Sequence, residues 1–336
     1  MKSRRSFIKT MGKSAAISSV AFSSGTALAS QLLYEPGQNL KPIRIGIIGA
    51  ENSHTIAYGK LFNIEKKFPG AEVKYVWGET AEFASNAAAA GNIPNIVEDP
   101  REMLGKIDAL IVDHRHPKYH LEAATPFMVE GIPTFIDKPF CYRANEGKEF
   151  LELARKHGTP VTSYSSVAHS NSTFDIKKQV ESMGKINQVI RTGPVDMDSE
   201  YGGIFFYGVH LLQPLMYIFG EDIERVRVTR KGQNGSATLV YTSGLFATLV
   251  FKNLSYGWET FVETEEGLAE LKSRVEESDP AINYSDMVEM FRTGKEPRSH
   301  QSILNCVSVL EALEKSVASQ QWEEVHMIEA ILKEYP

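Results

Sequence analysis

One lysine and a group of histidines are the residues of this chain whose types and spacing point to chemistry. Lys138 stands in Asp137-Lys138-Pro139, directly after the apolar run 132–136. That run reads as a parallel strand, so Lys138 is expected at the carboxyl edge of a sheet, where open α/β sheets bind their ligands. A desolvated lysine amine at such an edge can accept a proton near neutral pH. We therefore predict that Lys138 is a catalytic residue.

Histidines follow a second buried strand, 107–112, and should face the same crevice. His114 and His116 lie close together, and His120 comes four residues after His116. Imidazole is a common metal ligand. However, Pro117 opens the helix that would carry the last two histidines, and no carboxylate completes a familiar ligand set. We predict no metal, rank a metal-dependent hydrolase last, and expect His114 and His120 to line a polar pocket.

The loop after the first strand stands where a dinucleotide fingerprint belongs. Such a fingerprint needs glycine at three points, and only the first is kept, as Gly49. Glu51 and His54 occupy the other two points. The start of the following helix, with the hydroxyls of Ser53 and Thr55, still favours an anion. The loop alone leaves dinucleotide binding undecided.

An acidic residue follows the second strand at the place where one holds the adenosine ribose. This residue is Glu79, and no arginine follows it to accept a 2′-phosphate. NAD is therefore favoured over NADP. A solvated carboxylate at a helix start is an equally simple interpretation of Glu79 alone. The predicted cofactor-binding residues are Gly49, Ala50, Asn52, Ser53, Glu79, His114 and Lys138.

The elements that must position these residues alternate between strand and helix up to about residue 164. Such alternation predicts a doubly wound parallel sheet of the Rossmann type with right-handed crossovers. The predicted strands are 43–49, 73–77, 107–112, 134–136 and 160–164, and the predicted helices are 53–68, 81–90, 119–130 and 141–157.

The pattern changes in the second half, which we expect to form an α+β domain with a mostly antiparallel open-faced sheet. Ser243-Gly244 marks a hairpin between two alternating strands. The expected strands are 186–195, 223–230, 237–242 and 245–251, with one helix at 202–219 and another at the end of the chain. The predicted domains are a Rossmann-like NAD(P)-binding domain, 42–160, and a substrate-binding and oligomerisation domain, 161–336.

Several motifs, taken in order, resemble the Gfo/Idh/MocA family of dehydrogenases over residues 42–336. The matching segments are Ile45-Gly46-Ile47-Ile48-Gly49, Ile107-Asp108-Ala109 with His120, Asp137-Lys138-Pro139 in place of that family's Glu-Lys-Pro, Gly202-Gly203 leading to Gly208-Val209-His210, and Tyr217-Ile218-Phe219-Gly220. The resemblance implies that Lys138 contacts both the nicotinamide and the substrate hydroxyl, and that His210 works as acid or base. It implies a sugar or polyol substrate, bound by His120, His169, Tyr207 and His210.

The chain departs from that family beside its catalytic histidine. Phe206 stands where the family usually has an aspartate, and Gln213 where it often has a second acidic residue. A carboxylate orients the imidazole and stabilises its cation, which phenylalanine cannot do. Other side chains that could orient His210 are those of Tyr207, Asp196 and Asp198. Phe206, Glu51 and His54 keep open a second hypothesis, a binding or regulatory protein on a degenerate dehydrogenase fold. The resemblance also leaves open an enzyme that uses NAD to cleave glycosides or eliminate groups, as some members of that family do.

The first 29 residues read as a twin-arginine signal peptide, followed by a linker at 30–41. Ser3-Arg4-Arg5-Ser6-Phe7-Ile8-Lys9 precedes a mildly apolar stretch and the small-residue site Ala27-Leu28-Ala29. This pattern predicts export by the twin-arginine machinery, with a tightly held cofactor, and a periplasmic location. Removing the five basic residues of this leader changes 36 basic and 42 acidic residues to 31 and 42, a net charge near −11.

This acidic balance argues against a nucleic-acid or anionic-membrane partner, and no apolar stretch approaches the ~20 residues of a membrane span. The expected partners are a small-molecule substrate and a further copy of the same chain. Cys141 and Cys306 are the only cysteines. We expect both to be buried and unpaired.

Overall fold

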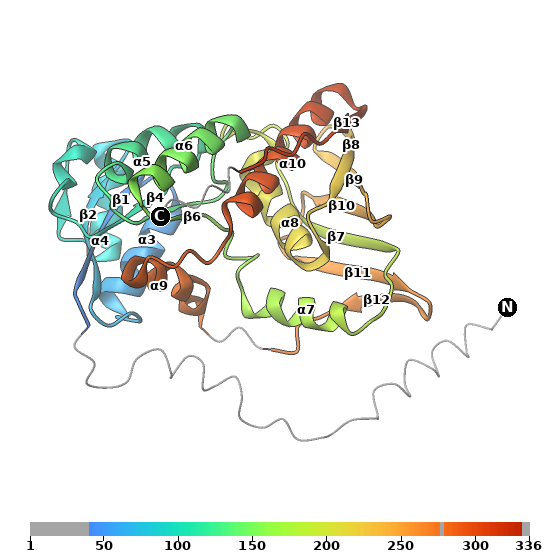
Figure 1. Cartoon of the computed structure of the whole chain (residues 1–336), viewed down its shortest axis with the longest axis horizontal. Helices are drawn as coiled ribbons and strands as arrows, with labels where there is room; N and C mark the ends of the chain where they lie inside the picture. Colours follow the sequence, from blue (N-terminus) through green and yellow to red (C-terminus); the bar gives the residue numbers. More distant parts are fainter. Residues whose placement is uncertain (1–39, 276–278, 331–336) are drawn as a thin grey trace, which may run out of the picture. The chain divides into compact units, whose positions relative to one another are not determined.

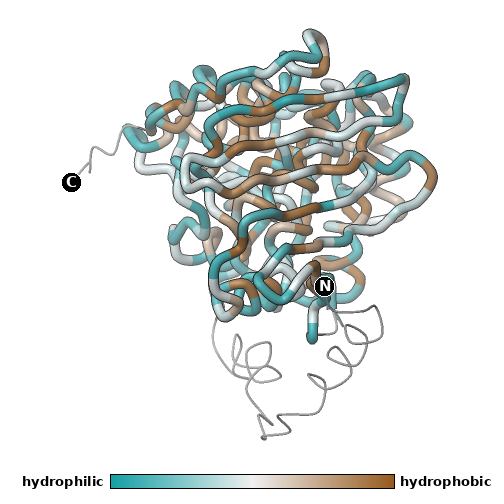
Figure 2. Tube along the Cα trace, turned by 90° about the vertical axis from the view of Figure 1, so that its right-hand side faces the viewer, coloured by the Kyte–Doolittle hydropathy of each residue, from teal (hydrophilic) through white to brown (hydrophobic). Residues whose placement is uncertain are grey.

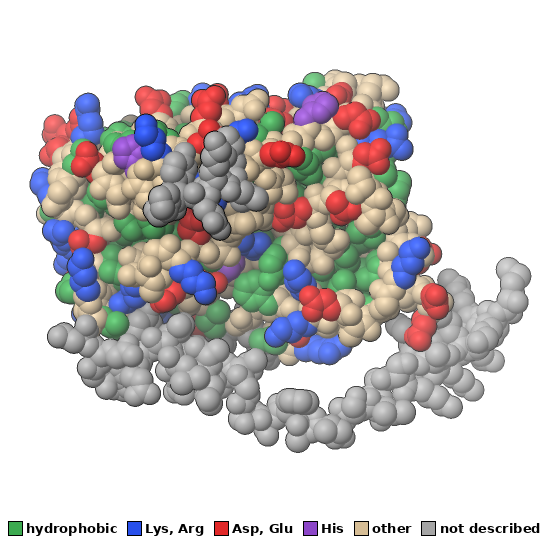
Figure 3. Space-filling model, viewed as in Figure 1, with side chains coloured by type: hydrophobic (Ala, Val, Ile, Leu, Met, Phe, Trp, Pro, Cys, Tyr) green, Lys and Arg blue, Asp and Glu red, His purple; other side chains and the backbone are tan. Residues whose placement is uncertain are grey.

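The computed structural model describes residues 40–275 and 279–330, and the predicted signal peptide lies outside these residues. Two sheets organise this part of the chain (Figure 1). None of the described helices is long and apolar enough to cross a membrane. On the face drawn in Figure 3, acidic and basic side chains are interspersed.

The first sheet has six parallel strands in the order β3-β2-β1-β4-β5-β6. Buried apolar residues fill β1, β4 and β5, as expected for strands covered on both faces. The chain order reverses between β1 and β4, which creates the switch point where such sheets bind ligands. The strands are β1 (Ile43–Ile48), β2 (Ala71–Trp77), β3 (Asn95–Ile96), β4 (Ala109–Val112), β5 (Thr134–Ile136) and β6 (Val161–Thr162).

Helices connect these strands. The predicted helix at 53–68 is shorter, because α3 (Ser53–Gly59) continues as a π-helical turn at Lys60–Ile64 and then ends. The predicted helix at 141–157 begins later, at Ala144. The backbone N–H of Ala144, at this first turn, donates to the carboxylate of Glu311. The remaining helices of this half are α4 (Ala81–Gly91), α5 (His120–Met128) and α6 (Ala144–His157), with short 3-10 turns at Pro100–Met103 and Pro117–Tyr119.

The second sheet has seven strands in the order β12-β11-β7-β10-β9-β8-β13, and only β7 and β10 pair in parallel. Its strands cross the face turned to the viewer in Figure 2. The predicted hairpin at Ser243-Gly244 is confirmed as the β9–β10 turn. The strands are β7 (Gln188–Pro194), β8 (Ile223–Lys231), β9 (Asn234–Tyr241), β10 (Phe246–Lys252), β11 (Glu259–Thr264), β12 (Gly267–Leu271) and β13 (Trp322–Glu324).

Helices of the second half pack on this sheet and also return to the first. Helix α8 (Ile204–Phe219) packs on β7, and α10 (His300–Ser319) packs on β8 and α6. Helix α9 (Ser285–Thr293) buries Met287, Val288 and Met290 in one core cluster with β1 and β2. The other helices are α7 (Asn171–Glu181) and a 3-10 turn at Pro280–Tyr284. The expected fold class, a parallel α/β sheet joined to a mostly antiparallel sheet, is confirmed.

Candidate active site

The turn after β1 requires glycine at its first point. Gly49 has a φ of +108°, and a Cβ placed on it would lie 2.6 Å from the backbone carbon of Asp113. The loop therefore passes directly over the end of β4. One oxygen of Glu79 accepts the backbone N–H groups of Ala50 and Glu51, at 2.8 and 2.9 Å. Its other oxygen is buried and has no hydrogen-bond partner among the described residues.

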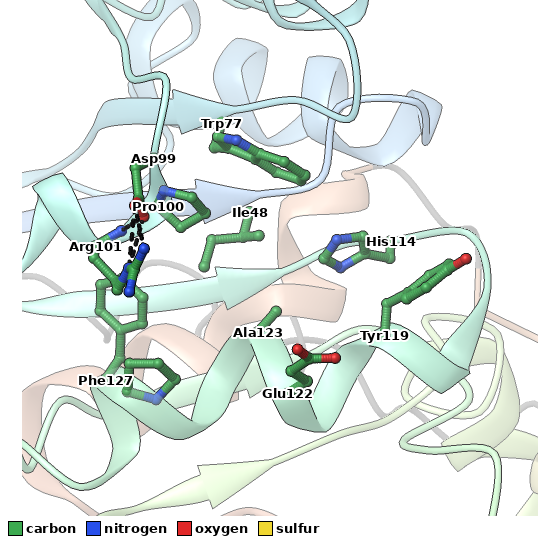
Figure 4. A pocket seen from close by; sticks show the side chains of 11 residues that line it. Ile48, Trp77, Asp99, Pro100, Arg101, His114, Tyr119, Glu122, Ala123 and Phe127 are labelled. Carbon is green, nitrogen blue, oxygen red and sulfur yellow. Dashed lines mark hydrogen bonds and ion pairs between the residues drawn. The ribbon is translucent and has the colours of Figure 1, made fainter.

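A cavity of about 440 Å³ opens beside this loop (Figure 4). Trp77 from the end of β2 and His114 from the end of β4 line it, with ring centroids 5.8 Å apart. Burial lowers the pKa of His114 to about 3, and its Nδ1 is a buried atom without a partner in the described chain. The cavity thus offers flat aromatic walls and one free ring nitrogen. Tyr119 stands at its rim.

These features fit a dinucleotide at two places. The unpartnered oxygen of Glu79 stands where an acidic residue accepts a ribose hydroxyl. The cavity beside it has the flat walls that suit an adenine ring. Glu51 is a repulsive residue for a pyrophosphate, but its carboxylate accepts a hydrogen bond from Tyr201 at 2.6 Å and has Arg115 3.9 Å away. The residues present are therefore compatible with a bound NAD.

A buried polar cluster fills the carboxyl edge between β1, β4 and β5. Asn52 caps α3 with its side-chain oxygen and donates its amide to Asp113 at 3.0 Å and to Asp137 at 3.3 Å. His54 Nδ1 lies 3.1 Å from Asp137. The Thr55 hydroxyl donates to the carbonyl oxygen of Gly49 at 2.7 Å and lies 2.5 Å from Asp113. His54 stands at the third glycine position of the fingerprint, and its side chain extends across the edge of the sheet to Asp137. This position explains how a large side chain is accommodated there.

The two carboxyl groups of this cluster carry different charges. Burial, followed by the charge of Asp137, raises the pKa of Asp113 well above its ordinary value. Burial also acts to raise the pKa of Asp137, but the charges of His54 and Lys138 outweigh it and hold that pKa low. Asp113 is therefore protonated while Asp137 is ionised beside Lys138. The ligand atoms of His54, Asp113 and Asp137 lie within 4.8 Å of one another, but Asn52 and Thr55 already form hydrogen bonds with these carboxyl groups.

Lys138 and His210 lie in one buried region although they come from different halves of the chain. Each is 7% exposed. Burial, and then the charge of Lys138, lower the pKa of His210 well below its ordinary value, so the imidazole is neutral. An aromatic set joins the two residues. The ring of Phe206 is 5.4 Å from Lys138 Nζ, and the ring of Tyr207 is 5.7 Å from that of His210.

The partner of His210 is a serine. The Ser165 hydroxyl lies 2.7 Å from His210 Nδ1. Gln213, one turn further along α8, accepts the backbone N–H of Ser165 at 2.6 Å. The expected partners Asp196 and Asp198 lie elsewhere: Asp198 pairs with Arg230, and Asp196 accepts the backbone N–H of Asp198. Tyr207 reaches His210 only by a ring contact.

Two other predicted substrate residues are engaged within the protein. His120 is fully buried, and its ring nitrogens lie 2.8 Å from the carbonyl oxygen of His114 and 3.0 Å from that of Pro139. His120 thereby links the end of β4 to the Lys138-Pro139 segment. Its contacts position His114 and Pro139 relative to each other. His169 is paired with Asp286 at 2.7 Å and stacked on Tyr164, which makes a separate cluster. Ser53, predicted for the cofactor, is exposed on the first turn of α3.

Strand order, glycine turn and acidic residue together define a dinucleotide-binding α/β protein of the Rossmann type. Residues 43–165 match the model of the Gfo/Idh/MocA family, described as an oxidoreductase family with an NAD-binding Rossmann fold. The match supports, for this part of the chain, the resemblance predicted from the motifs. The first half is an NAD-binding Rossmann domain of the oxidoreductase type.

The curated relative and the solved structures described here are distant from this chain. It is 22% identical over 203 residues to scyllo-inositol 2-dehydrogenase (NADP(+)) of Bacillus subtilis strain 168, which covers 54% of this chain and 62% of that protein. Among solved structures, myo-inositol dehydrogenase of Lactobacillus casei with NAD(H) and myo-inositol superposes with a TM-score of 0.73 at 14% identity, over 87% of this chain and 99% of that one. Myo-inositol 2-dehydrogenase of Lactobacillus plantarum gives 0.70 at 17% identity, over 85% and 100%. These likenesses establish the fold.

Proposed function

We propose that the protein is an NAD-dependent oxidoreductase that acts on a hydroxyl group of a sugar, a polyol or a related small molecule. The convergence of Lys138 and His210 is the observation that carries the proposal. Both are buried at the ligand-binding edge of the parallel sheet, and a neutral imidazole stands close to the lysine. The inositol dehydrogenases that share the fold support a polyol as the substrate class.

Each of the side chains at the site has its own role. Bound NAD supplies a hydride acceptor. Lys138 takes the proton of the substrate hydroxyl as the free amine, the form in which a lysine can act as a general base. His210 hydrogen-bonds the reacting oxygen. Phe206 and Tyr207 exclude water from the pair, and Glu79 with the Trp77–His114 cavity holds the adenosine end.

A binding or regulatory role on a degenerate dehydrogenase fold is the second candidate. The polar cluster favours it, because His54 occupies space at the sheet edge that glycine would leave open. An enzyme that oxidises its substrate transiently in order to cleave a glycoside or eliminate a group would use the same residues as a dehydrogenase. Net NADH production distinguishes this variant from a simple dehydrogenase.

Release of the cofactor separates these candidates. The purified protein is denatured, and the supernatant is tested for NAD(H) by its absorbance near 340 nm after enzymatic reduction. We expect about one nucleotide per chain. A protein without nucleotide, whose melting temperature also stays constant on addition of NAD or NADP, would be the binding protein of the second candidate. Lys138→Met should then leave nucleotide content unchanged and abolish turnover.

We also propose export to the periplasm and self-association. The paired Arg4-Arg5 and the cleavage site at Ala27-Leu28-Ala29 support export. Cell fractionation of the natural chain and of an Arg4→Lys/Arg5→Lys variant tests it, since the variant should stay in the cytoplasm. Phe246 and Val250 on β10 are 41% and 37% exposed, and such apolar side chains on an open sheet support a homo-oligomer. Light scattering of the eluted protein gives the mass.

A further inference from the structure

The Ser165 hydroxyl is a donor to His210 and not an acceptor from it. Its Oγ accepts the backbone N–H of Val167 at 3.1 Å and lies 2.7 Å from His210 Nδ1. Ser165 is completely buried, and no other described residue has a hydrogen bond with its Oγ. A buried hydroxyl hydrogen needs an acceptor. Since the Val167 N–H is itself a donor, only His210 Nδ1 can accept that hydrogen.

A neutral imidazole carries one hydrogen, and the hydrogen bond at one nitrogen decides where it sits. With Nδ1 acting as an acceptor, the hydrogen of His210 must be on Nε2. We infer that Ser165 holds His210 in the Nε2–H form, so that His210 offers the substrate a hydrogen-bond donor and Lys138 alone receives the hydroxyl proton. The second part of this inference rests on the proposed function.

The surroundings of His210 keep the imidazole neutral. Burial acts first, and the charged groups that face it are Lys138, His54, Arg191 and, with opposite sign, Asp137. Burial is the largest of these effects, and it disfavours a protonated ring even when Lys138 is the free amine. Neutral imidazole can still polarise a carbonyl oxygen, since an N–H donor needs no net charge to do so.

The two departures beside His210 have a common explanation. A carboxylate next to Nδ1 would demand a hydrogen on that nitrogen and leave Nε2 as a base. A serine hydroxyl has the opposite effect, because it donates to Nδ1 and leaves the hydrogen on Nε2. Gln213 holds the serine in place by accepting its backbone N–H at 2.6 Å. Phe206 then meets Lys138 with a ring face where an aspartate would have placed a charge.

The resulting step balances. Bound NAD would accept the hydride of the substrate carbon, and Lys138, as the free amine, takes the hydroxyl proton. The Nε2–H of His210 donates to the oxygen as it becomes a carbonyl and keeps its own hydrogen. Ser165 is therefore a positioning residue that acts through His210.

Nitrogen NMR of the full protein labelled with ¹⁵N-histidine tests the tautomer without any need for turnover. The signals of His210 are assigned by their loss in His210→Gln. We expect a hydrogen-bearing Nε2 and a bare Nδ1 in the natural protein and in Ser165→Thr, which keeps the hydroxyl. Ser165→Ala should give a mixture of both forms, and its kcat should fall about tenfold with KM nearly unchanged.

Ser165→Asp should move the hydrogen to Nδ1. A natural protein with its hydrogen on Nδ1, or a Ser165→Ala variant that keeps the natural pattern, would overturn the inference. If Ser165→Ala does not fold, the natural protein and Ser165→Thr still decide. A protein with the expected tautomer but without bound NAD and without turnover would count against the proposed function and leave the role of Ser165 intact.

Discussion

Lys138 Nζ lies 5.4 Å from the ring centre of Phe206, which stands on α8 one turn before His210. An aromatic face attracts a cation through its quadrupole without adding a charge. Lys138 therefore has a ring at its side, and the ionised carboxylate nearest to it along the chain is its neighbour Asp137. This arrangement leaves the lysine free of a strong ion pair with α8.

Removal of the ring should weaken the reaction moderately. Phe206→Leu keeps the apolar bulk and loses the aromatic face, which contributes about 0.5–2 kcal/mol, equivalent to roughly 2- to 30-fold. We expect kcat/KM, followed as NADH formation with a polyol substrate, to fall within this range. Phe206→Tyr keeps the face and serves as the control. Equal activity of the leucine and tyrosine variants would show that the ring contributes only volume.

The carboxylate of Glu79 should determine cofactor affinity. Glu79→Ala removes the buried oxygen that has no partner in the described structure, together with the anchor of the Ala50 and Glu51 N–H groups. A lost charged acceptor costs about 1.5–3 kcal/mol, so NAD should bind roughly 10- to 100-fold more weakly by calorimetry. Glu82→Ala, three residues further along at an exposed site of α4, is the matched control. Unchanged affinity in Glu79→Ala would remove Glu79 from the cofactor site.

Gly49 should tolerate no side chain. Gly49→Ala places a Cβ 2.6 Å from the Asp113 backbone in addition to the strain of a positive φ, and we expect a loss of about 2–4 kcal/mol in the free energy of unfolding. Gly105 also has a positive φ, but its Cβ would meet nothing within 4 Å. Gly105→Ala should therefore lose only about 1 kcal/mol. Urea denaturation compares the two, and equal losses would contradict the close approach of the loop to β4.

Asp113 and Asp137 should respond differently to the same isosteric change. Asp113→Asn imitates the protonated form and should not destabilise the protein at pH 7. Because the pKa of Asp113 is raised in the folded protein, this group costs stability as the pH rises, and the asparagine removes that cost. Asp137→Asn deletes an ionised carboxylate beside Lys138 and His54 and should cost about 3 kcal/mol. Thermal melts at pH 7 test the order, and equal effects would refute the assignment of charges.

Acid should destabilise the protein through His114. Its folded pKa of about 3 lies below the unfolded value near 6.5, so the unfolded chain binds the proton first. The associated stability is present above pH 6.5 and is lost as the pH falls toward 3, at no more than about 1.4 kcal/mol per pH unit. His114→Gln should show a shallower decline between pH 7 and 5, whereas exposed His157→Gln should follow the natural protein. Parallel curves for all three would exclude His114 as the cause.

The parallel sheet could be predicted from the sequence because its strands are continuous apolar runs with glycine or polar ends. Strands β11 and β12 were missed, since their alternating polar residues give weak signals on a half-exposed sheet. Helix α9 was missed as well, although four of its side chains are buried. The predicted helix at 202–219 starts at Ile204, because Gly202 and Gly203 adopt positive φ values.

The site could be predicted only where a residue follows a strand of the parallel sheet. Lys138, Gly49, Glu79 and His114 all stand at strand ends, and topology gathers such positions at one edge. Ser165 carried no signal, because a serine becomes the partner of a histidine only through a contact between distant segments. Gln213 was noticeable only as the replacement of an acidic residue, and its contact with Ser165 could not be predicted. Spacing along the chain therefore cannot reveal the residues that position a functional side chain from a distant segment.

Ser165 lies on the segment that carries the chain from β6, the last strand of the parallel sheet, to α7 and the second sheet. His210 belongs to the far side of that crossing and Lys138 to the near side. A movement of one sheet against the other would therefore stretch the Ser165–His210 hydrogen bond. The hydrogen of the imidazole could then move from Nε2 to Nδ1.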